Sequence, residues 1–118
     1  MIILYGIPNC DTVKKARAWL TDHGHSHEFH DFKKHGVPAH KLALWAEAAG
    51  WETLLNRKGT TWRQLDAATQ AGVHDAASAQ ALMLAHPSAI KRPVVEWGDA
   101  VTVGFDAAAW AARRPGRP

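Results

Sequence analysis

The first 32 residues carry a strand–helix–strand pattern that restricts the possible folds more than any other part of this sequence. Ile2–Tyr5 is a short apolar run stopped by a glycine and a proline, which is typical of a buried strand. Apolar residues then recur at helical spacing over 13–20, and Gly24 follows as a helix stop. Glu28–Phe32 is predicted to form a second strand. Two strands joined through a helix run parallel, so the chain is predicted to begin with a βαβ unit.

The middle of the chain is predicted to be helical. One helix opens at Val37–Pro38 and ends at Gly50. A short helix carrying Trp62 and Leu65 follows the polar loop 56–59. A longer helix covers Asp75–His86, where Pro87 ends it. The expected caps of the short helix are Thr60 or Thr61.

The last part of the chain returns to strands. Val94–Trp97 and Ala100–Val103 flank Gly98–Asp99, a two-residue hairpin signal, and Asp106 can cap a final helix. The predicted order is therefore βαβ, a helical insert, then ββα.

A chain of 118 residues is expected to form one domain. The sheet-containing core is expected over about 1–35 and 87–113 and the helical insert over about 37–86, with a disordered tail at 114–118. The six tryptophans recur at helix and strand positions and are predicted to belong to the core.

The charge argues against nucleic acid as a partner. The formal charge is +3, and three of the positive residues, Arg113, Arg114 and Arg117, lie in the last six positions. The rest of the chain is balanced, whereas a nucleic-acid face needs basic residues spread over the fold. These arginines are predicted to matter little for the site.

Cysteine content and hydropathy suggest a cytoplasmic protein. A single cysteine excludes an intramolecular disulfide and a cysteine-only zinc cage. No run approaches the roughly 20 apolar residues of a membrane span, and the N-terminus lacks signal-peptide features. A free thiol without an export signal fits a reducing compartment.

Cys10 is the sharpest chemical feature. It lies where the first strand turns into the first helix, and free backbone N–H groups and the positive helix end there stabilise a thiolate. Asn9, Thr12 and Lys14 are the candidate thiolate-stabilising neighbours, and Asp11 or Thr12 is the expected helix cap. The alternative is a buried cysteine acting as a small apolar residue. The polar setting favours the reactive thiol.

The sequence holds no second cysteine to resolve a disulfide. Val13 occupies the position at which a Cys-x-x-Cys pair would have its second thiol. A redox cycle at Cys10 must therefore use an external thiol such as glutathione or another protein.

Three cations could complete a site around a thiolate. Arg92 precedes Pro93 at the start of a strand, and Arg57 and Lys58 lie in the polar loop. Taken singly, each is explained as well by a strand start or by solvent exposure. Together with Cys10 they would form an oxyanion-binding nucleophile site.

A metal site is not predicted. His23, His25 and His27 alternate as ligands on one strand face would, with His30 and His35 nearby. The alternation spans Gly24, however, and no pair of acidic ligands frames it, so surface histidines explain it better.

Three blocks of the sequence together resemble the ArsC/Spx family, and most closely its YffB-like branch. The resemblance spans about residues 2–110. The blocks cover residues 5–16 (YGIPNCDTVKKA), 50–62 (GWETLLNRKGTTW) and 87–95 (PSAIKRPVV).

The resemblance implies an α/β, thioredoxin-like fold with a mixed four-stranded sheet and an all-helical insert. It implies a cis Arg92–Pro93 bond facing Cys10. Cys10 matches the family's nucleophile and Arg92 its oxyanion-binding arginine, while Arg57, or Lys58 with a shift of one residue, matches the arginine of the insert loop. The implied activity is a thiol reductase with no bound cofactor, which uses glutathione as co-substrate or a glutaredoxin-like reductant. Arg92 and Pro93 would position the glutathione.

Two departures argue against arsenate as the substrate. The family's arsenate reductases carry a histidine where this chain has Gly6. They also carry a third arginine where this chain reads Val103–Phe105. An alternative is a Spx-like transcription regulator that binds the C-terminal domain of the RNA polymerase α-subunit, because Gly50 matches a contact glycine of such proteins. Those regulators commonly use a Cys-x-x-Cys switch, which this chain lacks.

Overall fold

The computed structural model describes residues 1–113, and the chain divides into two compact units. The sheet unit is Met1–His35 with the chain from Arg92 onward, and the helical unit is Gly36–Lys91. The predicted tail at 114–118 lies outside the described residues.

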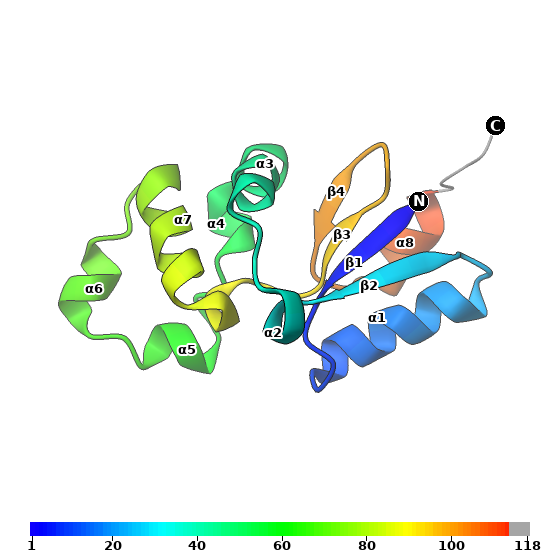
Figure 1. The fold of residues 1–118 in the computed structure, drawn as a ribbon, viewed down its shortest axis with the longest axis horizontal. Helices are drawn as coiled ribbons and strands as arrows, with labels where there is room; N and C mark the ends of the chain where they lie inside the picture. The colour runs from blue at the N-terminus through cyan, green and yellow to red at the C-terminus, as the bar shows by residue number, and fades with distance from the viewer. Residues whose placement is uncertain (114–118) are drawn as a thin grey trace. The chain divides into compact units, whose positions relative to one another are not determined.

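The sheet unit contains the predicted mixed four-stranded sheet (Figure 1). Its strands are β1 (Ile2–Gly6), β2 (His27–Asp31), β3 (Val94–Glu96) and β4 (Val101–Val103), in the order β2-β1-β3-β4. β1 pairs with β2 in parallel, and β3 is antiparallel to both β1 and β4. The thioredoxin-like fold is therefore confirmed, including the parallel βαβ start.

Two helices share the core of the sheet unit, α1 (Asp11–Asp22) and α8 (Ala107–Arg113). Alternate residues of the central strands point toward these helices, as the period of two in a strand requires. The buried cluster that results consists of Ile2, Leu4, Val13, Ala16, Leu20, Val95, Trp97 and Trp110. Burial of each large side chain contributes about 1.5–3 kcal/mol, so this cluster fixes α1 against β1.

A glycine ends α1, as predicted. Gly24 has φ +76° and donates to the carbonyl of Thr21 at 3.1 Å, and His25 donates to that of Leu20 at 2.9 Å. This pair of bonds satisfies the last carbonyls of the helix, and the left-handed backbone favours glycine.

β2 ends one residue earlier than the sequence predicts. Phe32 begins the short helix α2 (Phe32–His35) instead of ending the strand. The side chain of Asp31 accepts from the backbone N–H of Lys33 at 2.9 Å. That local bond turns the chain out of the strand, while Phe32 remains buried.

The helical unit is built on packing among α3 (Ala39–Ala49), α4 (Trp51–Leu54) and α7 (Ala76–Ala85). Its remaining elements are α5 (Thr60–Arg63), α6 (Ala67–Ala71) and the 3₁₀ turn η1 (Pro87–Ala89). The buried residues of α3 and α7 recur at helical spacing and are Leu42, Trp45, Ala46, Ala79, Leu82 and Met83.

The short helices differ from the prediction in two ways. Gly59 occupies the N-cap position of α5, so Thr60 and Thr61 lie inside the helix and cap nothing. α6 was not predicted at all, although Asp66 caps it by accepting from the N–H of Thr69 at 2.7 Å. An aspartate three residues before a threonine was the available signal.

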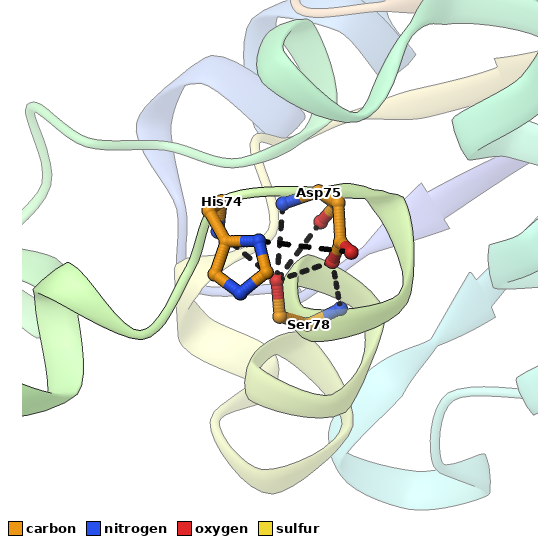
Figure 2. Close-up of polar contacts among 3 residues, drawn as sticks. All are labelled: His74, Asp75 and Ser78. Carbon is orange, nitrogen blue, oxygen red and sulfur yellow. Dashed lines mark hydrogen bonds and ion pairs between the residues drawn. The ribbon is translucent and has the colours of Figure 1, made fainter.

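Asp75 starts α7 with a capping box (Figure 2). Its carboxylate accepts from the backbone N–H of Ser78 at 2.9 Å, and the hydroxyl of Ser78 accepts from the N–H of Asp75 at 3.1 Å. The Ser78 side chain, and then its backbone N–H, hold the pKa of Asp75 below its usual value, with a smaller effect from His74. The reciprocal bonds satisfy donors that the first turn otherwise leaves open.

Only half of the tryptophans belong to the core, which corrects the prediction for all six. Trp45, Trp97 and Trp110 are buried, whereas the other three are half-buried. Their partly open rings remain available for contacts with charged groups.

Arg113 has a structural role that was not predicted from the sequence. It is the last residue of α8, where its guanidinium lies 4.5 Å from the ring centre of Trp97. It also donates to Asp99 at 2.7 Å. Arg113 therefore ties α8 to the β3–β4 hairpin.

Within the described range, every helix is too short or too polar to cross a lipid bilayer.

Candidate active site

Cys10 occupies the N-cap position of α1, and the helix begins at Asp11. The prediction that Asp11 or Thr12 caps this helix was therefore wrong. Its backbone is extended, with φ −108° and ψ 124°, and its carbonyl accepts the first helical bond, from the N–H of Lys14 at 2.9 Å. The thiol is half-buried and packs against the core of the sheet unit. It makes no capping hydrogen bond.

This position surrounds the thiol with uncompensated backbone dipoles. The first N–H groups of a helix have no acceptor within the helix, and the helix end carries partial positive charge. Serine, threonine, aspartate or asparagine would normally satisfy one of these donors from the N-cap. With a cysteine there, the donors can instead stabilise a thiolate or a bound anion.

A close contact between Gly6 and Val13 fixes the approach of β1 to α1. Val13 is fully buried, and a Cβ placed on Gly6 would lie 2.8 Å from its Cγ2 atom. A side chain at position 6 therefore requires Val13 to move. Glycine and valine therefore pack together at the positions where the resemblance places the histidine of the arsenate reductases and the second thiol of a Cys-x-x-Cys pair.

Arg92 and Pro93 lie at the start of β3 in the same unit. The bond between them is cis, as the resemblance implies. Pro93 is buried, and its carbonyl accepts from the N–H of Gly104 at 2.8 Å. Arg92 is half-buried. The predicted placement of this pair opposite Cys10 stays a prediction.

An aromatic contact occupies the region of the family's third arginine. The ring of Phe105 lies 4.8 Å from that of Trp110, edge to face, and packs against the core. This stretch supports the fold and contributes no cation.

The remaining predicted thiolate-stabilising residues are exposed. Asn9 precedes Cys10 in the loop, and Thr12 lies in the first turn of α1. Lys14 lines a shallow groove along α1 with Arg17 and His27. Their effect on the thiol stays a prediction.

Tyr5 of β1 forms a side-chain hydrogen bond to the neighbouring strand. Its hydroxyl donates to Glu96 of β3 at 2.9 Å. Burial, followed by the bond to this carboxylate, raises the pKa of Tyr5 well above its usual value. The phenol therefore stays protonated and ties the two strands together.

Arg57 and Lys58 belong to the helical unit, where they line a pocket of about 290 Å³. Lys91 adds a third cation and Glu52 the opposing charge. Lys91 was not predicted as a site residue, because it lies 33 positions after Lys58 in the sequence. Three cations around one cavity favour a small anionic group.

Backbone pairing between two distant segments builds this pocket. Leu55 pairs with Ile90 in an isolated antiparallel bridge. The N–H of Asn56 donates to Ala89 and that of Lys91 donates to Leu54, both at 2.8 Å. These bonds place Lys91 beside the loop that carries Arg57 and Lys58.

The histidine-rich stretch forms ring contacts. His23 stacks on Trp19 with ring centres 3.9 Å apart, and His25 lies 5.8 Å from the same ring. No group of three potential ligands in residues 1–113 could hold a metal ion.

Comparison with known proteins places the chain in one family. The ArsC family profile matches residues 5–113. The structure of the YffB protein is similar, with 51% identity and a TM-score of 0.90 over 95% of this chain and 97% of that one. An arsenate reductase (ArsC) related protein from Brucella melitensis is also 51% identical, with a TM-score of 0.75 over 95% and 92% of the two chains. A protein of Haemophilus influenzae is 39% identical over 90% of this chain and 92% of its own.

A more distant relative bears on the alternative function. The global transcriptional regulator Spx of Lactiplantibacillus plantarum is 26% identical over 90% of this chain and 80% of its own.

The uncapped start of α1 leads to a prediction about stability. The free energy of unfolding of Cys10→Ser should be about 1 kcal/mol higher than that of Cys10→Ala, because a serine hydroxyl can accept a hydrogen bond from a backbone N–H of the first turn. Both variants lose the packing of the sulfur, so their difference isolates the cap. Urea unfolding measures it, and equal stabilities would show that the amides of this turn are already satisfied.

The contact between Gly6 and Val13 predicts a non-additive pair of substitutions. Gly6→Ala should lower the free energy of unfolding by about 1–3 kcal/mol, because the new methyl group meets Val13. The loss should be smaller in the Val13→Ala background, where space is open. An equal loss in both backgrounds would contradict the account of this contact.

Proposed function

Because this chain belongs to the ArsC family, we propose that it is a thiol-dependent reductase in which Cys10 is the nucleophile and glutathione restores it. The observation that carries the proposal is the position of the chain's single thiol at the uncapped start of α1. Such a position favours the thiolate, which is the attacking form of cysteine.

The reaction proposed is a pair of thiol–disulfide exchanges. The Cys10 thiolate attacks one sulfur of a substrate disulfide, forms a mixed disulfide and releases the other sulfur as a thiolate, which takes a proton from water. A glutathione thiolate then attacks the substrate sulfur of the mixed disulfide and expels the Cys10 thiolate. In the completed cycle the first substrate sulfur released becomes a thiol, and glutathione ends in a mixed disulfide with the other substrate sulfur.

The absence of a second cysteine supports an external reductant. Val13 fills the position of a resolving thiol and is fully buried. An adduct at Cys10 has no partner elsewhere in this chain, because the sequence holds one cysteine. Glutathione, or a glutaredoxin-like protein charged by it, is the reductant proposed, in a cytoplasmic setting that keeps thiols reduced.

The cations are assigned to anionic groups of the substrate or of glutathione. Arg92 and Pro93 position the glutathione cysteinyl part, while Arg57 and Lys58 bind a carboxylate or oxyanion. The pocket that Arg57 and Lys58 line with Lys91 supports this assignment. Asn9, Thr12 and Lys14 stabilise the thiolate in the proposal.

A disulfide is a better candidate than arsenate for the substrate. Gly6 has no room for the histidine of the arsenate reductases unless Val13 moves. Phe105 packs on Trp110 in the region of their third arginine. Both departures remove groups that would hold an arsenate.

Regulation of transcription through RNA polymerase is the weaker candidate. Gly50 ends α3 with φ +88°, and a Cβ there would meet nothing within 4 Å, which suits a contact glycine. The thiol switch common in such regulators is absent, since position 13 is a buried valine. A pull-down with the C-terminal domain of the polymerase α-subunit decides between the two functions, because binding at micromolar concentration would favour the regulator.

The enzyme proposal predicts a specific adduct. Wild-type protein incubated with oxidised glutathione should gain one glutathione at Cys10, detected by mass spectrometry. Arg92→Ala should form the adduct about tenfold more slowly if Arg92 holds a charged group of glutathione.

Arg63→Ala serves as the matched control, because Arg63 is another arginine, exposed on α5 of the helical unit. This variant should react at the wild-type rate. A wild type that forms no adduct contradicts the glutathione link, and equal rates for wild type and Arg92→Ala remove Arg92 from the site. Circular dichroism checks that each variant is folded.

A further inference from the structure

Two tryptophan rings lie against the guanidinium of Arg57. The guanidinium carbon is 5.3 Å from the ring centre of Trp51 and 5.9 Å from that of Trp62. Both distances fall within the roughly 6 Å over which a cation is attracted to an aromatic face. Arg57 is exposed and both tryptophans are half-buried, so the rings offer a partly open surface on which a long cationic side chain can rest.

Hydrogen bonds hold the backbone of both tryptophans. Trp51 starts α4, and its carbonyl accepts from the N–H of Leu55 at 3.0 Å. The carbonyl of Trp62 in α5 accepts from the side chain of Gln70 at 2.8 Å and from the N–H of Leu65 at 3.1 Å. Two separate helices thus bring their indoles to one arginine.

The loop that carries Arg57 is also held in shape. The side chain of Asn56 accepts from the N–H of Lys58 at 3.2 Å. A Cβ on Gly59 would lie 2.7 Å from the Nδ2 atom of Asn56, so the chain folds closely over this side chain. Arg57 therefore leaves a loop held by hydrogen bonds, lines the pocket and lies within about 6 Å of both rings.

We propose that Trp51 and Trp62 are positioning residues that hold the Arg57 guanidinium ready for an anionic group of the substrate. The inference rests on the proposed function, in which Arg57 binds that group. A free arginine loses much rotamer freedom when it binds an anion, and a side chain already resting on two rings loses less. The rings act through Arg57 and do not touch the substrate.

The geometry also explains why these two tryptophans are not in the core. A purely structural indole gains most when it is fully buried. Trp51 and Trp62 instead leave part of each ring open, beside a charged residue that has no carboxylate partner among the ion pairs of residues 1–113. Glu52 lines the same pocket but forms no ion pair with Arg57 among those of residues 1–113, so the guanidinium N–H groups remain available for an incoming anion.

A double-mutant cycle separates positioning from mere support of the fold. The variants are Trp62→Leu, Arg57→Ala and the two combined, with Trp62→Phe as the conservative replacement that keeps an aromatic face. Trp62→Leu should slow adduct formation between Cys10 and oxidised glutathione by about 2- to 10-fold, as expected for one lost cation–π contact. Trp62→Phe should recover most of the rate.

The effect of Trp62→Leu should vanish when Arg57 is already alanine, because the ring then has nothing to hold. The same loss in both backgrounds would mean that Trp62 supports the fold, and would overturn the proposal. Arg63→Ala should leave the rate unchanged in either background. A failure of Trp62→Phe to recover the rate would also count against a role of the ring face.

Nuclear magnetic resonance gives a readout that does not depend on activity. The Arg57 side-chain protons should resonate at lower frequency than those of Arg63, because the two indole rings shield them. Trp62→Leu should move them toward ordinary arginine values, and Trp19→Leu should not. Unchanged Arg57 resonances in Trp62→Leu would overturn the positioning claim.

The two readouts also distinguish this inference from the function on which it rests. If wild-type protein forms no glutathione adduct, the proposed function fails, while the Arg57 resonances still decide whether the rings hold the guanidinium.

Discussion

The start of α1 is the constraint on which the site is built. The chain passes from β1 to Cys10, and α1 then begins with no side chain at the N-cap bound to its first N–H groups. The contact between Gly6 and Val13 sets how closely the strand and helix approach. A core shared by β1, α1, β3 and α8 holds the arrangement. The thiol therefore sits at the positive end of a helix that the whole sheet unit keeps in place.

Different local contacts hold the candidate site residues Pro93, Arg57 and Lys91 in place. Pro93 is fixed through its bond to Gly104, next to the end of β4. Arg57 is fixed by a turn at Asn56 and by two indole rings. Lys91 joins it because a short antiparallel bridge returns the chain to the loop. The local folding of each unit thus holds these residues in place without a ligand, and a preorganised group loses less freedom if it binds an anion.

Much of the fold could be predicted from the sequence because local and long-range signals agree. The parallel pairing of the first two strands, the stop at Gly24 and the Asp106 cap all match the structure. The errors arose where two local choices are close in energy. Cys10 displaced Asp11 as the N-cap, Gly59 displaced the threonines, and a bond from Asp31 shortened β2.

The site was predicted less completely, for a physical reason. Cys10 carries a local signal, and the cis Arg92–Pro93 bond, which the family resemblance implied, is confirmed. Lys91 joins its pocket only through a backbone bridge between segments far apart in sequence, and no periodicity reveals that pairing. The six tryptophans all resembled core residues, and only the structure separates Trp51 and Trp62 from the buried three.

The central claim is that the fold activates Cys10, and its rate of alkylation tests this most directly. Iodoacetamide should modify the native thiol several-fold faster at pH 7 than the same thiol in the urea-denatured chain, even though the native thiol is half-buried. Free glutathione, measured in both buffers, corrects for any effect of urea on the reagent. A native thiol that reacts no faster than the denatured one would contradict the account.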